Sequence, residues 1–152
     1  MRILIVSDSH GHARNLLEVL LRHTDITTVI HLGDGHRECE DAAEAFPDRN
    51  FYGVAGNCDF ACPAPGLRLE TFGGKRLMLA HGHHYGVKGG YYTIACAARE
   101  REVDAVLFGH THIPFSDYTD GLYLFNPGSL RDGNYGIADV CTAGLVFRHM
   151  KL

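Results

Sequence analysis

The chain has 152 residues, a length that suits one domain burying about 70% of the surface that the unfolded chain exposes. Its formal net charge is −4 and its 14 Lys and Arg residues are scattered, so it lacks a basic stripe that would track a nucleic-acid backbone. No apolar run approaches the roughly 20 residues that span a bilayer, and the first residues lack a signal-peptide pattern. We therefore expect one cytoplasmic domain over residues 1–152, with no stable nucleic-acid complex and no membrane contact.

The first half of the chain alternates strands and helices. An apolar run from Ile3 to Val6 predicts a strand over 2–7 that is buried on both faces. Leucines at helical spacing predict a helix over 12–22, and a shorter acidic helix is expected over 36–45, ending at Phe46-Pro47. Further strands are expected to end near Ile30 and to cover 51–54. This is a βαβα opening.

The second half is richer in strands. A hairpin is expected from 67–72 and 76–80 joined by Gly73-Gly74, a favoured turn pair. A helix over 91–101 then precedes a strand over 104–108. Four more strands with tight turns and no helix are expected over 115–118, 122–125, 136–140 and 142–149. We expect this last third to form a second, mostly antiparallel sheet that packs on the first.

The five cysteines are odd in number and include no Cys-x-x-Cys pair. This pattern favours reduced thiols over a disulfide framework or a zinc site. Cys96 and Cys141 are expected in the core.

Side chains that bind metals follow five of the predicted strands. The residues are Asp8, His10, Asp34, Asn57, His81, His110 and His112. Because alternate side chains of an extended segment point the same way, Asp8 and His10 are expected to approach one ion together, and so are His110 and His112. The carboxyl ends of strands in an open sheet meet at one edge, so all seven side chains are expected at the same edge of one sheet. That arrangement is typical of a two-metal hydrolase site.

Each motif alone also has an ordinary explanation. A Gly-Asp or Gly-Asn pair is usually a turn, and a pair of histidines often lies on the surface. Glycines stand beside almost every one of these side chains, where they let the backbone turn sharply or approach an ion closely. The order and context of the motifs together favour the metal site.

These motifs, namely Asp-x-His, Gly-Asp, Gly-Asn-x-Asp, His-Gly-His and Gly-His-Thr-His, resemble those of the calcineurin-like metallophosphoesterases. The short chain and its Asn126-Pro127-Gly128-Ser129 turn are similar to their compact prokaryotic YfcE-type phosphodiesterases. The resemblance implies an α/β (α+β) fold, a four-layer αββα sandwich of two mixed sheets flanked by helices. It also implies two metal sites bridged by Asp34. One site would hold Asp8, His10 and His112, and the other Asn57, His81 and His110.

The expected chemistry follows from these ligands. Carboxylate, imidazole and amide donors suit Mn²⁺, Fe²⁺, Ni²⁺ or Zn²⁺, and the resemblance favours Mn²⁺. Two ions about 3.5–4 Å apart would share a hydroxide that attacks phosphorus in line, without a covalent phosphoenzyme. Asp34, Asn57, His81 and His110 are the residues expected to be catalytic.

Cys58 stands where many members of the wider family have a histidine that protonates the leaving oxygen. A thiol is a poor substitute, because its unperturbed pKa is near 8.5 and its hydrogen bonding is weak. The resemblance to the compact subgroup, which also has Cys there, implies a preference for diesters over monoesters. Cys58 has no base beside it in the sequence, which argues against a role as nucleophile.

Asn57, Cys58 and His83 are expected to contact the substrate, a small phosphodiester or nucleotide-like molecule. His83, His12 and His36 can equally bind loop carbonyls, and the role of Asp59 is open. An aromatic rim including Phe60 suits a nucleotide or aryl group, but core or interface packing explains it as well. The alternatives are a phosphomonoesterase and a non-catalytic metal-binding scaffold resembling the retromer subunit of this fold. Homo-oligomerisation is implied only by the resemblance.

Overall fold

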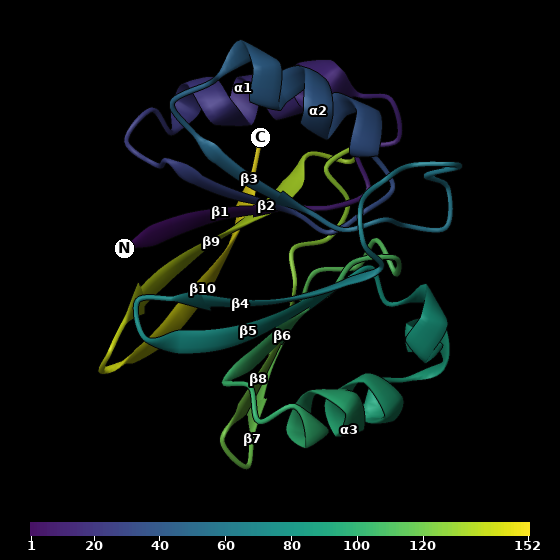
Figure 1. The fold of residues 1–152 in the computed structure, drawn as a ribbon, viewed down its shortest axis with the longest axis vertical. Helices are drawn as coiled ribbons and strands as arrows, with labels where there is room; N and C mark the ends of the chain where they lie inside the picture. The colour runs from purple at the N-terminus through teal and green to yellow at the C-terminus, as the bar shows by residue number, and fades with distance from the viewer.

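Two five-stranded sheets face each other in the computed structural model, which describes residues 1–152 (Figure 1). The first sheet has the order β10 (Gly144–Lys151), β9 (Asn134–Cys141), β1 (Arg2–Val6), β2 (Thr28–His31) and β3 (Asn50–Gly53). The second has the order β4 (Leu67–Phe72), β5 (Lys75–Ala80), β6 (Ala105–Leu107), β8 (Leu122–Asn126) and β7 (Phe115–Thr119). Both sheets mix parallel and antiparallel pairs.

Helices cover the outer face of each sheet. Helices α1 (Ala13–Arg22) and α2 (His36–Ala45) lie on the first sheet, and α3 (Tyr92–Glu100) lies on the second (Figure 1). Two 3₁₀ turns, η1 (His83–Tyr85) and η2 (Val87–Gly89), precede α3. This arrangement confirms the expected four-layer αββα sandwich. No helix is both long and apolar enough to cross a membrane.

The core explains why β1 is apolar along its whole length. Ile3 and Ile5 face the second sheet, in a cluster that includes Leu77 and Leu107. Leu4 and Val6 face the other way, against buried side chains of α1. Alternate residues of one strand therefore stabilise two different layers, and each such side chain contributes about 1.5–3 kcal/mol when it is fully buried.

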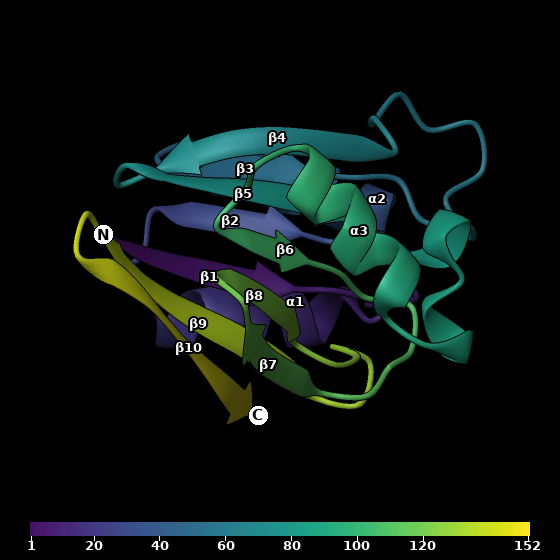
Figure 2. The ribbon, with the colours of Figure 1, turned by 90° about the horizontal axis from the view of Figure 1, so that it is seen from below.

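Strand register aligns the carboxyl ends of the parallel strands. In the first sheet Val6 pairs with His31, and His31 pairs with Gly53. In the second sheet β6 runs parallel to both β5 and β8. Figure 2 shows β1, β2 and β6 pointing the same way, so loops from both sheets gather beyond the same end of the sandwich.

The last third of the chain does not form a sheet of its own, and that prediction was wrong. Strands β7 and β8 join the second sheet, whereas β9 and β10 join the first. The reason is that β1 has an open side opposite β2, which β9 fills as an antiparallel neighbour. Buried residues of β9 such as Ile137 and Ala138 then extend the core on both faces of the first sheet.

The cysteines are all free, but their burial differs from the prediction. Cys141 is exposed because it ends β9 at the hairpin turn. Cys96 is only partly buried. The buried thiol is that of Cys39 on α2, and burial raises its pKa to about 12.

Candidate metal centre

The seven predicted ligands converge beyond the carboxyl ends of strands from both sheets. Asp8, Asp34 and Asn57 follow β1, β2 and β3 of the first sheet. His81 and His110 follow β5 and β6 of the second. The prediction that one sheet supplies every ligand was therefore wrong. The two stacked sheets share the site because their parallel strands point in the same direction (Figure 2).

One group of ligand atoms joins Asp8, His10 and His112. The Nε2 atom of His112 lies 3.2 Å from Asp8 Oδ1 and 3.2 Å from His10 Nε2. His10 Nε2 lies 3.7 Å from Asp8 Oδ1. Atoms so spaced can ligate one cation.

A second group surrounds His81. Its Nε2 atom lies 3.1 Å from Asn57 Oδ1 and 3.2 Å from His110 Nδ1. Asp34 lies between the two groups, with Oδ2 at 3.4 Å from His81 Nε2 and 3.7 Å from His10 Nε2. The structure thus brings all the predicted ligands together with Asp34 in the middle.

Left-handed backbone conformations, and not extended strands, direct these side chains. Asp8, His10, Asp34, His110 and His112 all have positive φ, between 44° and 66°. The argument that alternation along an extended segment aligns Asp8 with His10 was therefore wrong, since β1 ends at Val6. Positive φ is uncommon for residues other than glycine, and such strain concentrates at functional sites. Five of the eight such residues in this chain are predicted ligands.

A buried carboxylate oxygen without a partner indicates that the centre fits a cation. Asp8 is fully buried, and its Oδ1 atom accepts no hydrogen bond. Its Oδ2 atom accepts bonds from the Ser7 hydroxyl at 2.6 Å and the His110 N–H at 3.0 Å. Since an unpaired buried charge is costly, Oδ1 facing the histidine cluster is what a metal ligand requires.

The electrostatics of the centre also favour positive charge. Burial acts to raise the pKa of Asp34, but hydrogen bonds from His81 and the Cys58 N–H hold it well below its usual range. Burial acts to lower the pKa of His81, but the nearby carboxylates of Asp34 and Asp8 raise it above the ordinary value of histidine. The carboxylates thus stabilise a cation here, whether a proton or a metal ion.

Backbone contacts orient the ligands. The ring of His81 makes a 2.7 Å hydrogen bond from Nδ1 to the Leu32 carbonyl, which leaves Nε2 free for a metal. Glycines allow close approach at two places. A Cβ at Gly56 would collide with the Asp34 carboxylate, and one at Gly109 would collide with Ser7 and Asp8. Both glycines therefore let the backbone pass close to ligand side chains, and close approach to an ion stays a prediction.

The Asn126–Ser129 turn ties the two sheets together at the site. Asn126 Nδ2 donates to the Gly109 carbonyl at 2.8 Å, and the Ser129 hydroxyl donates to the Asp8 carbonyl at 2.9 Å. The sequence marked this segment as a turn, but it gave no sign of these two bonds. The turn positions ligand loops that come from different sheets.

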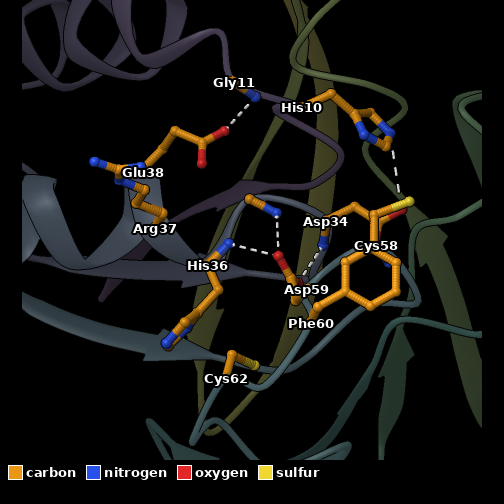
Figure 3. A pocket seen from close by; sticks show the side chains of 11 residues that line it. His10, Gly11, Asp34, His36, Arg37, Glu38, Cys58, Asp59, Phe60 and Cys62 are labelled. Atoms are coloured by element: carbon orange, nitrogen blue, oxygen red, sulfur yellow. Dashed lines mark hydrogen bonds and ion pairs between the residues drawn. The ribbon is translucent and has the colours of Figure 1, made fainter.

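Asp59, whose role was open, joins two ligand loops. Its Oδ2 atom accepts the N–H groups of Asp34 and Gly56 at 2.7 and 2.8 Å. Its Oδ1 atom accepts those of Gly35 and His36, both at 2.9 Å (Figure 3). Burial acts to raise the pKa of Asp59, but these four N–H groups lower it overall. Asp59 is thus a positioning residue for Asp34.

We expect Asp59→Asn to weaken metal binding about 10- to 100-fold, the usual cost of losing a group that orients a ligand. The variant keeps the size of the side chain, but its NH₂ group would face N–H donors that need an acceptor. Calorimetric titration with Mn²⁺ measures the loss. Asp48→Asn, at an exposed position, is the control. Unchanged affinity in Asp59→Asn would show that the loops hold their positions without it.

The other predicted contact residues lie in different surroundings. The His12 ring binds the carbonyls of Ser9 and His10 in its own loop, and His36 pairs with Glu40 at 3.1 Å. His83 is half-buried, with its ring centroid 5.4 Å from that of His81. Cys58 is exposed, and its backbone N–H donates to Asp34 Oδ1 at 2.8 Å.

A pocket of about 460 Å³ opens beside the centre. His10, Asp34 and Cys58 line it next to the ligand cluster (Figure 3). Its remaining lining includes Arg37 and Glu38 of α2 and Phe60 and Cys62 of the following loop. A molecule bound at the centre therefore has space for a substituent of moderate size.

The sequence matches known proteins along most of its length. The family model of the calcineurin-like phosphoesterase superfamily domain matches residues 1–143. The Bacillus subtilis protein named "Probable metallophosphoesterase YsnB" is 36% identical over 132 residues, which cover 86% of this chain and 76% of that protein. The Escherichia coli phosphodiesterase YfcE is 32% identical over 103 residues, covering 57% of this chain and 50% of that protein.

Solved structures share the fold. A conserved Streptococcus pneumoniae protein described as a predicted phosphoesterase superimposes with a TM-score of 0.84 at 23% identity, covering 99% of this chain and 88% of that chain. Vps29 of Entamoeba histolytica, solved in complex with zinc, superimposes with a TM-score of 0.76 at 19% identity, covering 99% of both chains. At these identities the likeness shows the fold alone.

Proposed function

The chain belongs to the calcineurin-like phosphoesterase superfamily, and on this premise we propose that it is a divalent-metal-dependent phosphodiesterase. The observation that carries the proposal is the convergence of ligand side chains from two sheets around the unpartnered Asp8 Oδ1. An ordinary surface cluster would leave no buried carboxylate oxygen without a partner.

We assign Asp8, His10 and His112 to one ion, and Asn57, His81 and His110 to a second. Asp34 serves both, because its Oδ2 atom lies near His10 and His81 alike. These oxygen and imidazole donors suit Mn²⁺, Fe²⁺, Ni²⁺ or Zn²⁺, and we propose Mn²⁺ because the family resemblance favours it. When bound, two such ions supply Lewis-acid activation of water and of the phosphoryl oxygens.

The protein's own groups position these ligands and the substrate. The Leu32 carbonyl fixes the His81 ring, and the Asp59 carboxylate fixes the loop that carries Asp34. We propose that Asn57, Cys58 and His83 contact the phosphoryl group of the substrate. In this proposal the Asn57 amide and the His83 imidazole orient the phosphoryl group for in-line attack by water.

Cys58 is not the nucleophile in this proposal. Burial, followed by the nearby Asp34 carboxylate, raises the pKa of the Cys58 thiol above its usual value. In the metal-free protein this shift disfavours the thiolate, which is the nucleophilic form of cysteine. The thiol is also a weaker acid than an imidazolium for protonating a leaving alkoxide, which disfavours esters with poor leaving groups.

The test is hydrolysis of bis(4-nitrophenyl) phosphate beside 4-nitrophenyl phosphate, with Mn²⁺ and after chelation. We expect the diester to be cleaved faster, and chelation to abolish the activity because the metal supplies several kcal/mol of transition-state stabilisation. Cleavage of the monoester at an equal rate would overturn the diesterase assignment. No cleavage of either substrate by protein that holds two Mn²⁺ ions would favour a non-catalytic scaffold.

A further inference from the structure

The pocket beside the centre is placed to receive one arm of a bound diester. His10 and Asp34, two of the proposed ligands, line one side of it. The first turn of α2 forms its far side, and the loop after Cys58 supplies further lining (Figure 3). Phosphorus held at the ligand cluster therefore places one ester arm at the entrance of this pocket.

Phe60 offers an aromatic face to that arm. Its side chain is 88% exposed, the highest fraction among the large apolar side chains. Figure 3 shows the ring next to Cys58, on the side of the pocket nearer the centre. No aromatic neighbour contacts the ring, whereas other pairs such as Tyr118 and Tyr123 pack against each other. Exposed aromatic rings are favourable platforms for flat bases.

Arg37 supplies an unpaired positive charge on the opposite side of the pocket (Figure 3). It is exposed and forms no ion pair, unlike His36 next to it, which pairs with Glu40. Two acidic groups of the same pocket lining are already engaged. Glu38 accepts bonds from the Ser9 hydroxyl and the Gly11 N–H, and Asp59 accepts four backbone N–H groups. The guanidinium is therefore available to an anionic group of a ligand.

We infer that this pocket binds a nucleotide arm of the substrate, with the base stacked on Phe60 and a second phosphate paired with Arg37. The inference rests on the proposed function and narrows its substrate to diesters that join a nucleoside phosphate. An aryl arm without an anion would use Phe60 but leave Arg37 unpaired. A sugar phosphate would use Arg37 but gain nothing from the ring.

The stacking part is tested with the 5′-phosphorylated dinucleotide pTpT and its analogue lacking the bases. Phe60→Ala should raise KM for pTpT about 5- to 150-fold, the range expected for loss of one stacked base, and leave KM for the analogue unchanged. A smaller effect on kcat would indicate lost binding, not lost chemistry. Phe60→Tyr should restore the wild-type KM. Tyr118→Ala is the matched control, because Tyr118 is an exposed aromatic residue on the edge strand β7.

The charge part is tested by comparing pTpT with TpT, which lacks the terminal phosphate. The wild type should prefer pTpT by about 5- to 30-fold, the value of a charge-assisted hydrogen bond that is partly exposed. Arg37→Gln should remove this preference, and Arg37→Lys should restore part of it. Arg76→Gln is the control, because Arg76 is exposed near the start of β5 and His81 follows the other end of that strand. This variant should leave the preference for pTpT unchanged.

A binding measurement separates this inference from the proposed function. The dissociation constant of thymidine 3′,5′-bisphosphate, measured by calorimetry on Mn²⁺-loaded protein, needs no turnover. Weaker binding by Phe60→Ala and Arg37→Gln would support the pocket even in a protein that cleaves no diester. Unchanged binding and KM in both variants would overturn the inference, and metal-dependent cleavage of bis(4-nitrophenyl) phosphate would still support the proposed function. If only Phe60→Ala weakened binding, the pocket would be inferred to bind an uncharged aromatic arm and not a nucleotide.

Discussion

Asp34→Asn is expected to lose both metal ions together and to reduce phosphodiester hydrolysis by about 10²–10⁴-fold, since bound metals supply several kcal/mol of transition-state stabilisation. The physical reason is the place of Asp34 between the two ligand groups, 3.7 Å from His10 Nε2 and 3.4 Å from His81 Nε2. A neutral amide removes one negative charge from both sites at once. A titration with Mn²⁺ should therefore show parallel loss of two binding events, not of one.

Asp34→Asn is an informative variant because it is expected to fold like the wild type. The amide has the size of the carboxylate, and its oxygen can still accept the Cys58 N–H, now bonded at 2.8 Å. Asp41→Asn, at an exposed acid on α2, is the control and should keep metal content and activity. Loss of one ion with the other kept at full affinity would show that Asp34 does not bridge them. Full metal content and activity would refute the ligand assignment.

Local patterns made most of the elements predictable. Leu16 and Leu20 of α1 and the alternating sides of β1 are buried as the sequence indicates, because each pattern is set by neighbours along the chain. Leu17 and Leu21 of the same leucine pattern are exposed, and Val19 completes the buried face of α1 instead. The Gly73-Gly74 turn likewise fixes the β4–β5 hairpin, and both glycines have positive φ. The division of the last four strands between two sheets was not predictable in this way, since it depends on which strand edge remains open.

The seven candidate ligands could be named from the sequence, but their geometry could not. The seven side chains follow five strands in short motifs, so they can be named from the sequence. Their meeting depends on two sheets stacking with parallel strands in one direction, which no single segment encodes. The positive φ of Asp8 and His110 was also missed. Asp and His are enriched in that conformation, so their position beside glycine was the available signal.

Asp59 shows why positioning residues are harder to find than ligands. Three of its four N–H partners lie 23 to 25 positions away along the chain. No short motif reports such contacts. The sequence showed an acid after Gly-Asn-Cys and left its role undecided, and only the packing of two loops explains it. Distant backbone partners of this kind become visible once the tertiary structure is known.

Cys58→His is expected to raise the hydrolysis of diesters and monoesters with poor leaving groups by about 10²-fold or more, the lower end of what general acid catalysis contributes. The thiol lies beside the centre, with its sulfur within 4.8 Å of ligand atoms of His10 and Asp34. Because the residue is exposed, an imidazole has room there, and the backbone bond to Asp34 does not depend on the side chain. The measurement is kcat/KM across aryl and alkyl esters of increasing leaving-group pKa.

The dependence on the leaving group distinguishes acid catalysis from a general gain in activity. An acid that protonates the departing oxygen helps alkyl esters most, because a 4-nitrophenolate leaves readily without a proton. The rate for bis(4-nitrophenyl) phosphate should therefore change little, and the plot of rate against leaving-group pKa should become shallower. Cys58→Ser, which removes the thiol without adding an imidazole, should show neither effect. Equal gains for good and poor leaving groups in Cys58→His would mean that the new side chain acts on binding, and that the thiol is not what disfavours monoesters.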